Sequence, residues 1–377
     1  MMQKIEERSE QVEYSLMSRY LSEFKQIAQQ EIAKYHLPFF LENDISVLLD
    51  FCIDGGKLIR GQIVVRTLRF LAVSHSQQPR EGICSEEELR IGCLVGWCIE
   101  MIQAFFLIAD DVMDQSETRR GKACWYKIVG LGAINDAVLL ESLTFCILKR
   151  IVPHQVYLEL SELVRSIIFR TELGQALDMN LPHKTEIADF CMKDYLQMVT
   201  YKTAYYTFVF PVEAGFILWG HLKEGDNLCE THKNASKLGP SIPVFGELEP
   251  ILVRIGQLFQ VQDDYLDCFG DAALTGKIGT DIQDKKYSWL AVKAVELLKG
   301  DEQGLAVLRD NYGNTNGGED SIHRVKQLYQ QLHLEEAFKK WEQEVLDEIG
   351  ILHSNIQPLA SKNIIKHLCE MIRHRKK

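Results

Sequence analysis

Two short acidic segments of this 377-residue sequence have the residue types and the spacing needed to bind a divalent metal ion. In the first, Asp110, Asp111 and Asp114 follow an apolar run. Asp110 and Asp114 are four residues apart, so on a helix they lie on one face about one turn from each other. Like charges at a helix carboxyl end are unfavourable, because they repel one another and the helix dipole disfavours them. A cation must compensate them, and Arg119 and Arg120 could do so on a solvated surface.

The second acidic segment, FQVQDDYLDCFGD at 259–271, repeats this pattern about 150 residues later. Two such clusters on separate helices are typical of two walls of one site. Carboxylate oxygens suit Mg²⁺, which takes one or two carboxylates together with water and the oxygens of a substrate phosphate. The pattern therefore predicts a magnesium-bound diphosphate. The candidate metal ligands are Asp110, Asp111, Asp114, Asp263, Asp264 and Asp267.

Aromatic residues precede the first cluster. Phe106 lies four residues, about one helical turn of 5 Å, before Asp110, and Phe105 is its neighbour. Two phenylalanines at such positions are also typical of an ordinary core. Together with the acidic and basic groups, however, they predict a site for an amphiphile that has a diphosphate head and a hydrocarbon tail.

The elements that must position these residues are helices. Apolar residues recur at intervals of three and four, without convincing period-two runs, through about 9–35, 86–114, 136–151, 155–180, 190–219, 250–269 and 322–348. No fixed-period repeat and no shift of composition marks a second domain. We expect an all-α fold in which residues 1–377 form one large bundle of long antiparallel helices around a central apolar cavity.

Composition excludes several classes of protein. The formal net charge is −11 and the isoelectric point about 5.5, so no general positive field exists for a nucleic-acid partner. The ten cysteines are scattered without zinc-like spacing, which predicts reduced thiols in a cytoplasmic protein. We expect no targeting leader, because the amino terminus is acidic, and no transmembrane segment.

Six longer motifs carry a resemblance to a known family. They are GGKLIRG at 55–61, QAFFLIADDVMDQSETRRGKACWY at 103–126, NDAVLLE at 135–141, TELGQALD at 171–178, YKTAYYTF at 201–208 and FQVQDDYLDCFGDAALTGKIGTDIQDKKYSW at 259–289. In this order the chain resembles the short-chain trans-isoprenyl diphosphate synthases, and most closely the animal-type enzymes that stop at fifteen carbons. The resemblance runs from about residue 50 to the basic carboxyl end. It implies an isoprenoid-synthase bundle and a homodimer.

The resemblance also implies a binding site for the allylic diphosphate. In the family, the residues that match Asp110, Asp114 and Asp263 hold three Mg²⁺ ions around the diphosphate. The residues that match Arg119, Lys202 and Lys277 add positive charge to this leaving group, where charge accumulates as the C–O bond breaks. The catalytic residues implied in this way are Asp110, Asp114, Lys202, Asp263 and Lys277.

The second substrate, isopentenyl diphosphate, has its own implied ligands: Lys57, Arg60, Gln103, Arg120 and Arg375. Thr203 and Gln260 match polar residues near the reacting carbons, while Tyr206 and Phe259 match aromatic walls that tolerate a cation. Phe105 and Phe106 resemble the pair that stops elongation. The implied reaction joins isopentenyl diphosphate to dimethylallyl and then geranyl diphosphate, by ionisation, condensation and elimination, and gives (E,E)-farnesyl diphosphate.

The sequence departs from the family pattern at three places, and two alternatives remain open. Ile59 stands where the family usually has Asn, Ala272 stands where Pro is common, and the SIPVFGELEP region at 241–250, within the proline-rich stretch 237–250, is longer than usual. A terpene synthase built on this scaffold would ionise an allylic diphosphate without isopentenyl diphosphate, and would not need the second group of cationic residues. A catalytically silent subunit of a heteromeric synthase is the other alternative.

Overall fold

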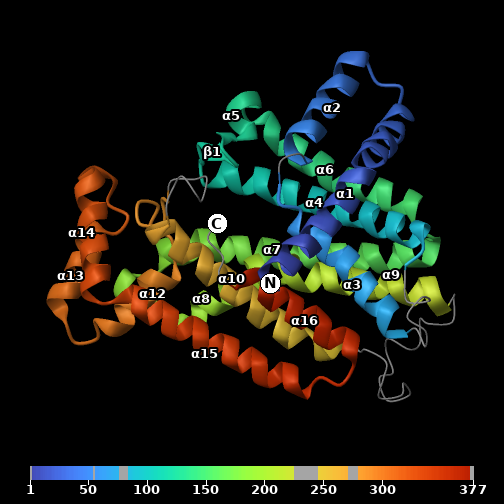
Figure 1. The fold of residues 1–377 in the computed structure, drawn as a ribbon. Helices are drawn as coiled ribbons and strands as arrows, with labels where there is room; N and C mark the ends of the chain where they lie inside the picture. The colour runs from blue at the N-terminus through green and yellow to red at the C-terminus, as the bar shows by residue number, and fades with distance from the viewer. Residues whose placement is uncertain (1, 54–55, 76–83, 225–244, 271–278, 374–377) are drawn as a thin grey trace. The chain divides into compact units, whose positions relative to one another are not determined.

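A computed structural model describes residues 2–53, 56–75, 84–224, 245–270 and 279–373, and in these ranges the fold is all-α (Figure 1). Its described strands are the two-residue pair β1 (Thr118–Arg119) and β2 (Lys122–Ala123). The chain divides into two compact units, one made of 1–165, 210–245 and 358–364, and the other of 166–209, 246–357 and 365–377. We call them unit 1 and unit 2. The all-α prediction is confirmed, whereas the single functional domain over 1–377 and its central apolar cavity stay predictions.

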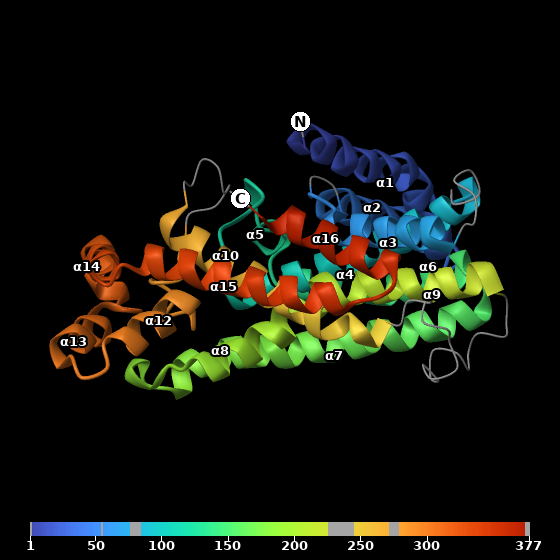
Figure 2. The ribbon, with the colours of Figure 1, turned by 60° about the horizontal axis from the view of Figure 1, so that its bottom comes forward.

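Unit 1 is built around one long buried helix. Its described elements are α1 (Met2–Ala33), α2 (Phe39–Ile53), α3 (Ile59–His75), α4 (Glu86–Met113), the β1–β2 hairpin, α5 (Trp125–Val129), α6 (Gly132–Ile151), the first part of α7 (His154–Lys184), α9 (Phe210–Glu224) and the start of α16 (Leu359–Ile372). Helix α1 lies beside α2 and α3 (Figure 2). Helix α4 packs against α1, α3, α6 and α9, so it is the core of this unit.

The start of α4 is fixed by local chemistry. The Ser85 hydroxyl accepts the Glu88 backbone N–H and the Glu88 carboxylate accepts the Ser85 backbone N–H, which forms a capping box. By length and composition α4 is the one helix among the described residues that could cross a membrane, and 78% of the window concerned is buried inside the structure. A helix that is apolar on all sides is also what the middle of a large soluble core requires.

Unit 2 surrounds helix α10 (Glu249–Phe269). Its other described elements are the second part of α7, η1 (Ile187–Asp189), α8 (Met192–Val199), η2 (Thr200–Val209), most of η5 (Phe245–Glu247), α12 (Trp289–Leu297), α13 (Glu302–Asn311), η6 (Thr315–Gly317), α14 (Gly318–Gln331), α15 (Leu334–Asn355) and the end of α16. Helix α10 packs against η2, α8, α12 and α15. It shares an aromatic core with them, in which the rings of Tyr265 on α10 and Phe338 on α15 stack with centroids 4.2 Å apart.

One predicted helix is wrong. The apolar pattern over 322–348 predicted a continuous helix, but the chain turns between α14 and α15. His333 has a φ of 52°, in the left-handed region that interrupts a helix. The three-and-four periodicity continues across the break because both helices contribute apolar residues, among them Leu328 and Leu334, to the same core.

Candidate functional site

The first aspartate cluster lies in unit 1, at the carboxyl end of α4. Asp110 and Asp111 belong to its last turn, and Asp114 is the C-cap, whose backbone N–H donates to the Asp110 carbonyl at 2.8 Å. Gln115 follows with a φ of 53° and ends the helix. The predicted i, i+4 spacing therefore places Asp110 and Asp114 one turn apart at a helix end.

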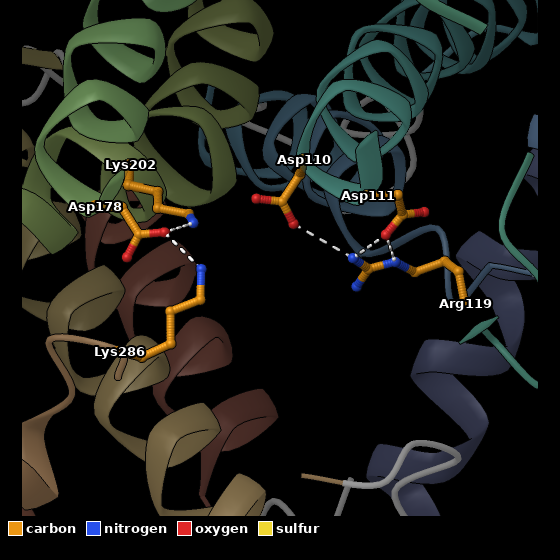
Figure 3. Close-up of polar contacts among 6 residues, drawn as sticks. All are labelled: Asp110, Asp111, Arg119, Asp178, Lys202 and Lys286. Atoms are coloured by element: carbon orange, nitrogen blue, oxygen red, sulfur yellow. Dashed lines mark hydrogen bonds and ion pairs between the residues drawn. The ribbon is translucent and has the colours of Figure 1, made fainter. Parts of the chain in front are cut away.

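Arg119 supplies the compensating charge (Figure 3). Its Nη2 atom lies 3.3 Å from Asp110 Oδ2, and its Nε atom donates to Asp111 Oδ1 at 3.0 Å. Burial lowers the pKa of Arg119, but the charges of Asp111 and Asp110 outweigh burial and raise it. Asp111 is buried, whereas Asp110 and Asp114 are half-buried. The middle carboxylate thus holds the arginine, and the outer two are the more accessible.

The β1–β2 hairpin positions this arginine. Arg119 pairs with Lys122 in antiparallel register, and the two residues between them, Arg120 and Gly121, have φ values of 55° and 74°. Two consecutive positive φ values are typical of the tight turn that suits the twist of a hairpin. The RRG of the sequence is therefore a turn that places two arginines immediately after the acidic helix end.

A second cationic group of unit 1 lies where α3 meets α4. Arg60 is buried in the first turn of α3, Lys57 is exposed just before that helix, and Gln103 is half-buried on α4. The two helices approach closely because they meet at glycines. A Cβ atom on Gly96 would lie 3.0 Å from the Cα atom of Gly61.

Glu100, which the sequence reasoning missed, lies beneath this group. Its Oε1 atom accepts the Gly61 backbone N–H at 2.9 Å, and its side chain is buried. Burial raises the pKa of Glu100, although the charges of Arg60 and Arg120 act in the opposite direction. The available signal was a single acid inside the otherwise apolar stretch VGWCIEMI. Through the Gly61 N–H, Glu100 on α4 fixes the first turn of α3, which carries Arg60.

Two lysines and a buried aspartate form a separate cluster in unit 2 (Figure 3). Lys202 Nζ and Lys286 Nζ lie 2.6 Å and 3.1 Å from the same oxygen, Asp178 Oδ2. Burial alone would raise the pKa of the Asp178 carboxyl, but the two ammonium groups outweigh burial and lower it to about 2. Lys202 is a predicted site residue, whereas Lys286 was not predicted; its signal in the sequence is the DKK that follows the second acidic segment.

The helix that carries Lys202 has an unusual form. Residues Thr200–Val209 form a π-helix, a rare and wide helical form that is frequent at functional sites. It packs against α7 at Gly174, where a Cβ atom would lie only 2.1 Å from the Lys202 backbone nitrogen. The glycine in TELGQALD thus lets two backbones meet, and brings Lys202 within reach of Asp178 one turn further along α7.

The second aspartate cluster lies on α10. Asp263 and Asp267 are half-buried, and Asp264 is buried with 6% of its surface exposed. Asp267 Oδ1 accepts the Asp281 backbone N–H at 3.1 Å. Burial raises the pKa of Asp264, and the charge of Asp263 adds to this effect. As in the first cluster, the middle carboxylate is the most enclosed of the three.

Polar and aromatic side chains surround this cluster within unit 2. The Thr203 hydroxyl donates to Gln260 Oε1 at 2.7 Å, and the rings of Phe208 and Phe259 lie edge to face with centroids 5.4 Å apart. Tyr206 is half-buried on the π-helix. Phe259 precedes Asp263 by four residues, as Phe106 precedes Asp110. Each cluster therefore has an aromatic ring one helical turn before its first carboxylate.

The donors of both clusters fit magnesium. They are carboxylates without a Cys and His set, and the described residues contain no group of three acidic, His or Cys side chains arranged as a complete metal site. Mg²⁺ does not need such a cage, since it keeps several waters and binds through few carboxylates together with phosphate oxygens. Asp110 and Asp263 belong to different units, and their action on one shared diphosphate stays a prediction.

Other predicted site residues have the following positions. Phe105 is buried and Phe106 half-buried on α4, with ring centroids 5.0 Å apart, and their role as a chain-length floor stays a prediction. Ile59 is the half-buried first residue of α3. Lys277, Arg375, Ala272 and residues 237–244 lie outside the described residues.

Comparison with known proteins assigns the family. A model of the polyprenyl synthetase family matches residues 43–332, a range that includes segments of both units. This range is more than half of the chain, and the chain belongs to the polyprenyl synthetase family.

Individual relatives are more specific than the family. The farnesyl pyrophosphate synthase of Gallus gallus is 41% identical over 341 residues, which cover 88% of this chain and 84% of the relative. The farnesyl pyrophosphate synthase of Bos taurus is 39% identical and covers 88% of both chains. Among solved structures, T. brucei farnesyl diphosphate synthase complexed with risedronate has a TM-score of 0.83 at 28% identity, and covers 97% of this chain and 100% of that one. The predicted family and isoprenoid-synthase fold are confirmed.

Proposed function

We propose that this chain is a magnesium-dependent trans-prenyltransferase that condenses isopentenyl diphosphate with dimethylallyl and then geranyl diphosphate to give (E,E)-farnesyl diphosphate. One observation supports this function above all. A chain 41% identical to a farnesyl pyrophosphate synthase contains two carboxylate clusters and two groups of cationic side chains.

The described side chains suit ionisation of an allylic diphosphate. Arg119 in unit 1 and the pair of Lys202 and Lys286 in unit 2 present positive charge beside carboxylates. As the C–O bond breaks, negative charge grows on the leaving oxygens, so cations fixed near them stabilise this state more than the bound substrate. Bound Mg²⁺ would add charge stabilisation at the same oxygens. The residues that would hold it are Asp110, Asp114 and Asp263, and we expect three ions.

The aromatic side chains would exclude water from the reacting carbons. An allylic cation formed in water would be captured as an alcohol, so the reacting carbons must be kept dry. Phe106 on α4 and Phe259 on α10 are half-buried rings one helical turn before each acidic cluster, and the rings of Phe105 and Phe208 pack against them. The double bond of isopentenyl diphosphate would then be the only nucleophile within reach.

Arg60, Lys57, Gln103 and Arg120 are our candidates for binding the diphosphate of isopentenyl diphosphate. Guanidinium groups bind two oxygens of a phosphate at once, which suits a site that uses little metal. This group also separates the proposal from a terpene synthase, which has no use for it. The relatives we compared are farnesyl pyrophosphate synthases and do not support the terpene synthase alternative.

We also propose that the chain is a homodimer in the cytoplasm. Leu131, Ile134 and Val138 lie three and four residues apart along α6, and are 74%, 53% and 51% exposed. An apolar row of this kind suits an interface with a second copy of the chain. The ten cysteines are scattered along the chain without zinc-like spacing, which is typical of reduced thiols in a compartment such as the cytoplasm. Sedimentation of the purified chain tests the dimer.

The deciding experiment incubates the purified chain with Mg²⁺ and dimethylallyl or geranyl diphosphate, with and without isopentenyl diphosphate. We expect a C15 diphosphate only when isopentenyl diphosphate is present, and no product after magnesium is removed by chelation. A volatile hydrocarbon or alcohol formed without isopentenyl diphosphate would instead identify a terpene synthase. An isolated chain that is folded and inactive would identify a silent subunit.

A further inference from the structure

Three protein donors contact the carboxyl group of the middle aspartate of the second cluster. Asp264 Oδ2 accepts the Tyr195 hydroxyl at 2.7 Å and the Trp289 backbone N–H at 2.8 Å. Asp264 Oδ1 accepts the Gln260 side-chain amide at 3.0 Å. Tyr195 and Trp289 are themselves completely buried. Both carboxylate oxygens are thus directed at donors of unit 2, and three donors from three separate segments hold this side chain in one orientation.

These contacts fix the direction of a longer hydrogen-bond chain. The Gln260 amide turns its NH₂ group toward Asp264, to which it donates. Its carbonyl oxygen is then the atom left to accept the Thr203 hydroxyl, at 2.7 Å. Thr203, in turn, has its single proton committed to Gln260 and keeps only lone pairs for any other contact.

We propose that Asp264, held by Tyr195, is a positioning residue that orients Gln260 and Thr203 rather than a magnesium ligand. This inference rests on the proposed function, because it assigns these groups to the prenyl-transfer site. The hydroxyl oxygen of Thr203 becomes an oriented acceptor that favours positive charge nearby. Asp263, half-buried beside Asp264, remains the candidate metal ligand of this pair.

The first test makes the same substitution, Asp to Asn, at two neighbouring aspartates. Binding of inorganic pyrophosphate with Mg²⁺ is measured by titration calorimetry for the full chain and for the variants Asp263→Asn and Asp264→Asn. We expect Asp263→Asn to weaken binding about tenfold or more, and Asp264→Asn to change it less than about threefold. Equal weakening in both variants would make Asp264 a metal ligand and overturn the proposal. Circular dichroism identifies a variant that does not fold.

The second test asks whether Tyr195 acts through Thr203. Tyr195→Phe removes one donor to Asp264 and keeps the buried ring, so we expect kcat to fall about tenfold with the KM values unchanged. Thr203→Val removes the last hydroxyl of the hydrogen-bond chain. Thr203→Ser keeps this hydroxyl and should retain most activity. If Tyr195 acts through Thr203, the Tyr195→Phe/Thr203→Val double variant should be no slower than Thr203→Val alone.

A matched control separates this effect from a general loss of packing. Tyr287 is another buried tyrosine of unit 2. Its hydroxyl accepts a hydrogen bond from the Cys191 backbone N–H and is not part of the hydrogen-bond chain from Tyr195 to Thr203. Tyr287→Phe should leave kcat within about twofold. Fully additive losses for Tyr195 and Thr203, or an equal kcat loss in Tyr287→Phe, would overturn the proposal. If the unmodified chain makes no C15 diphosphate, the proposed function fails, while the calorimetric comparison still decides between positioning and metal binding.

Discussion

Replacing Asp178 with Asn removes the shared partner of Lys202 and Lys286, and the cost can be worked from the structure. Asp178 is only 6% exposed, and the lysine side chains are 25% and 22% exposed. The pKa of its carboxyl falls from the ordinary 3.8 to about 2 in the folded protein. This difference corresponds to about 2 kcal/mol of stability. We therefore expect Asp178→Asn to destabilise unit 2 by about 2 kcal/mol at neutral pH, a fall in Tm of about 5 °C.

The stability that Asp178→Asn loses must depend on pH in one direction. Because the folded-state pKa of Asp178 lies below its unfolded value, the contribution is complete above about pH 4 and is lost as the pH falls through about 2. The natural chain should therefore lose stability over this acid range, whereas Asp178→Asn should lose less over the same range. The difference in Tm between the natural chain and Asp178→Asn should decrease as the pH falls.

Thermal unfolding followed by circular dichroism between pH 2 and pH 7 measures this difference in Tm. The matched control is Asp284→Asn, since Asp284 is an exposed aspartate two residues from Lys286 and its removal changes net charge equally. We expect its Tm to stay within about 1 °C of the natural chain at pH 7. Parallel pH profiles for the two variants would refute the reasoning that burial between two ammonium groups makes Asp178 stabilising.

Three further changes test other parts of the site. Phe106→Ala should lengthen the product beyond C15, because the ring would no longer block growth of the tail; chromatography of the products measures this, and an unchanged C15 product would exclude Phe106 as the floor. Gly174→Ala places a Cβ atom 2.1 Å from the Lys202 nitrogen and should cost at least about 2 kcal/mol, so an unchanged Tm would contradict the close approach of the two backbones. Gly56→Ala places a Cβ atom 3.0 Å from the Arg120 guanidinium and should raise KM for isopentenyl diphosphate about fivefold without changing KM for the allylic substrate; an equal rise in both would indicate a general disturbance.

Several features were predictable because their cause is local. The four-residue spacing in each acidic motif needs only helical geometry to place Asp110 with Asp114, and Asp263 with Asp267, on one face. The long apolar runs predicted α4 and α10 within a few residues of their observed ends. The turn at His333 was missed because a single left-handed residue leaves the apolar periodicity of the flanking helices intact.

The sequence by itself determined the helical class, the two carboxylate motifs, and the resemblance that the family match confirms, because all three depend on residue types at short spacing. Only the tertiary structure decided which partner each charged group has. Asp264 meets Tyr195 from 69 residues away, and Asp178 meets Lys286 from 108 residues away. Such pairs form where helices distant in sequence pack together, and no periodicity along the chain records them. The burial that makes Asp264 and Asp178 different from solvent-exposed carboxylates is likewise a property of the packed core alone.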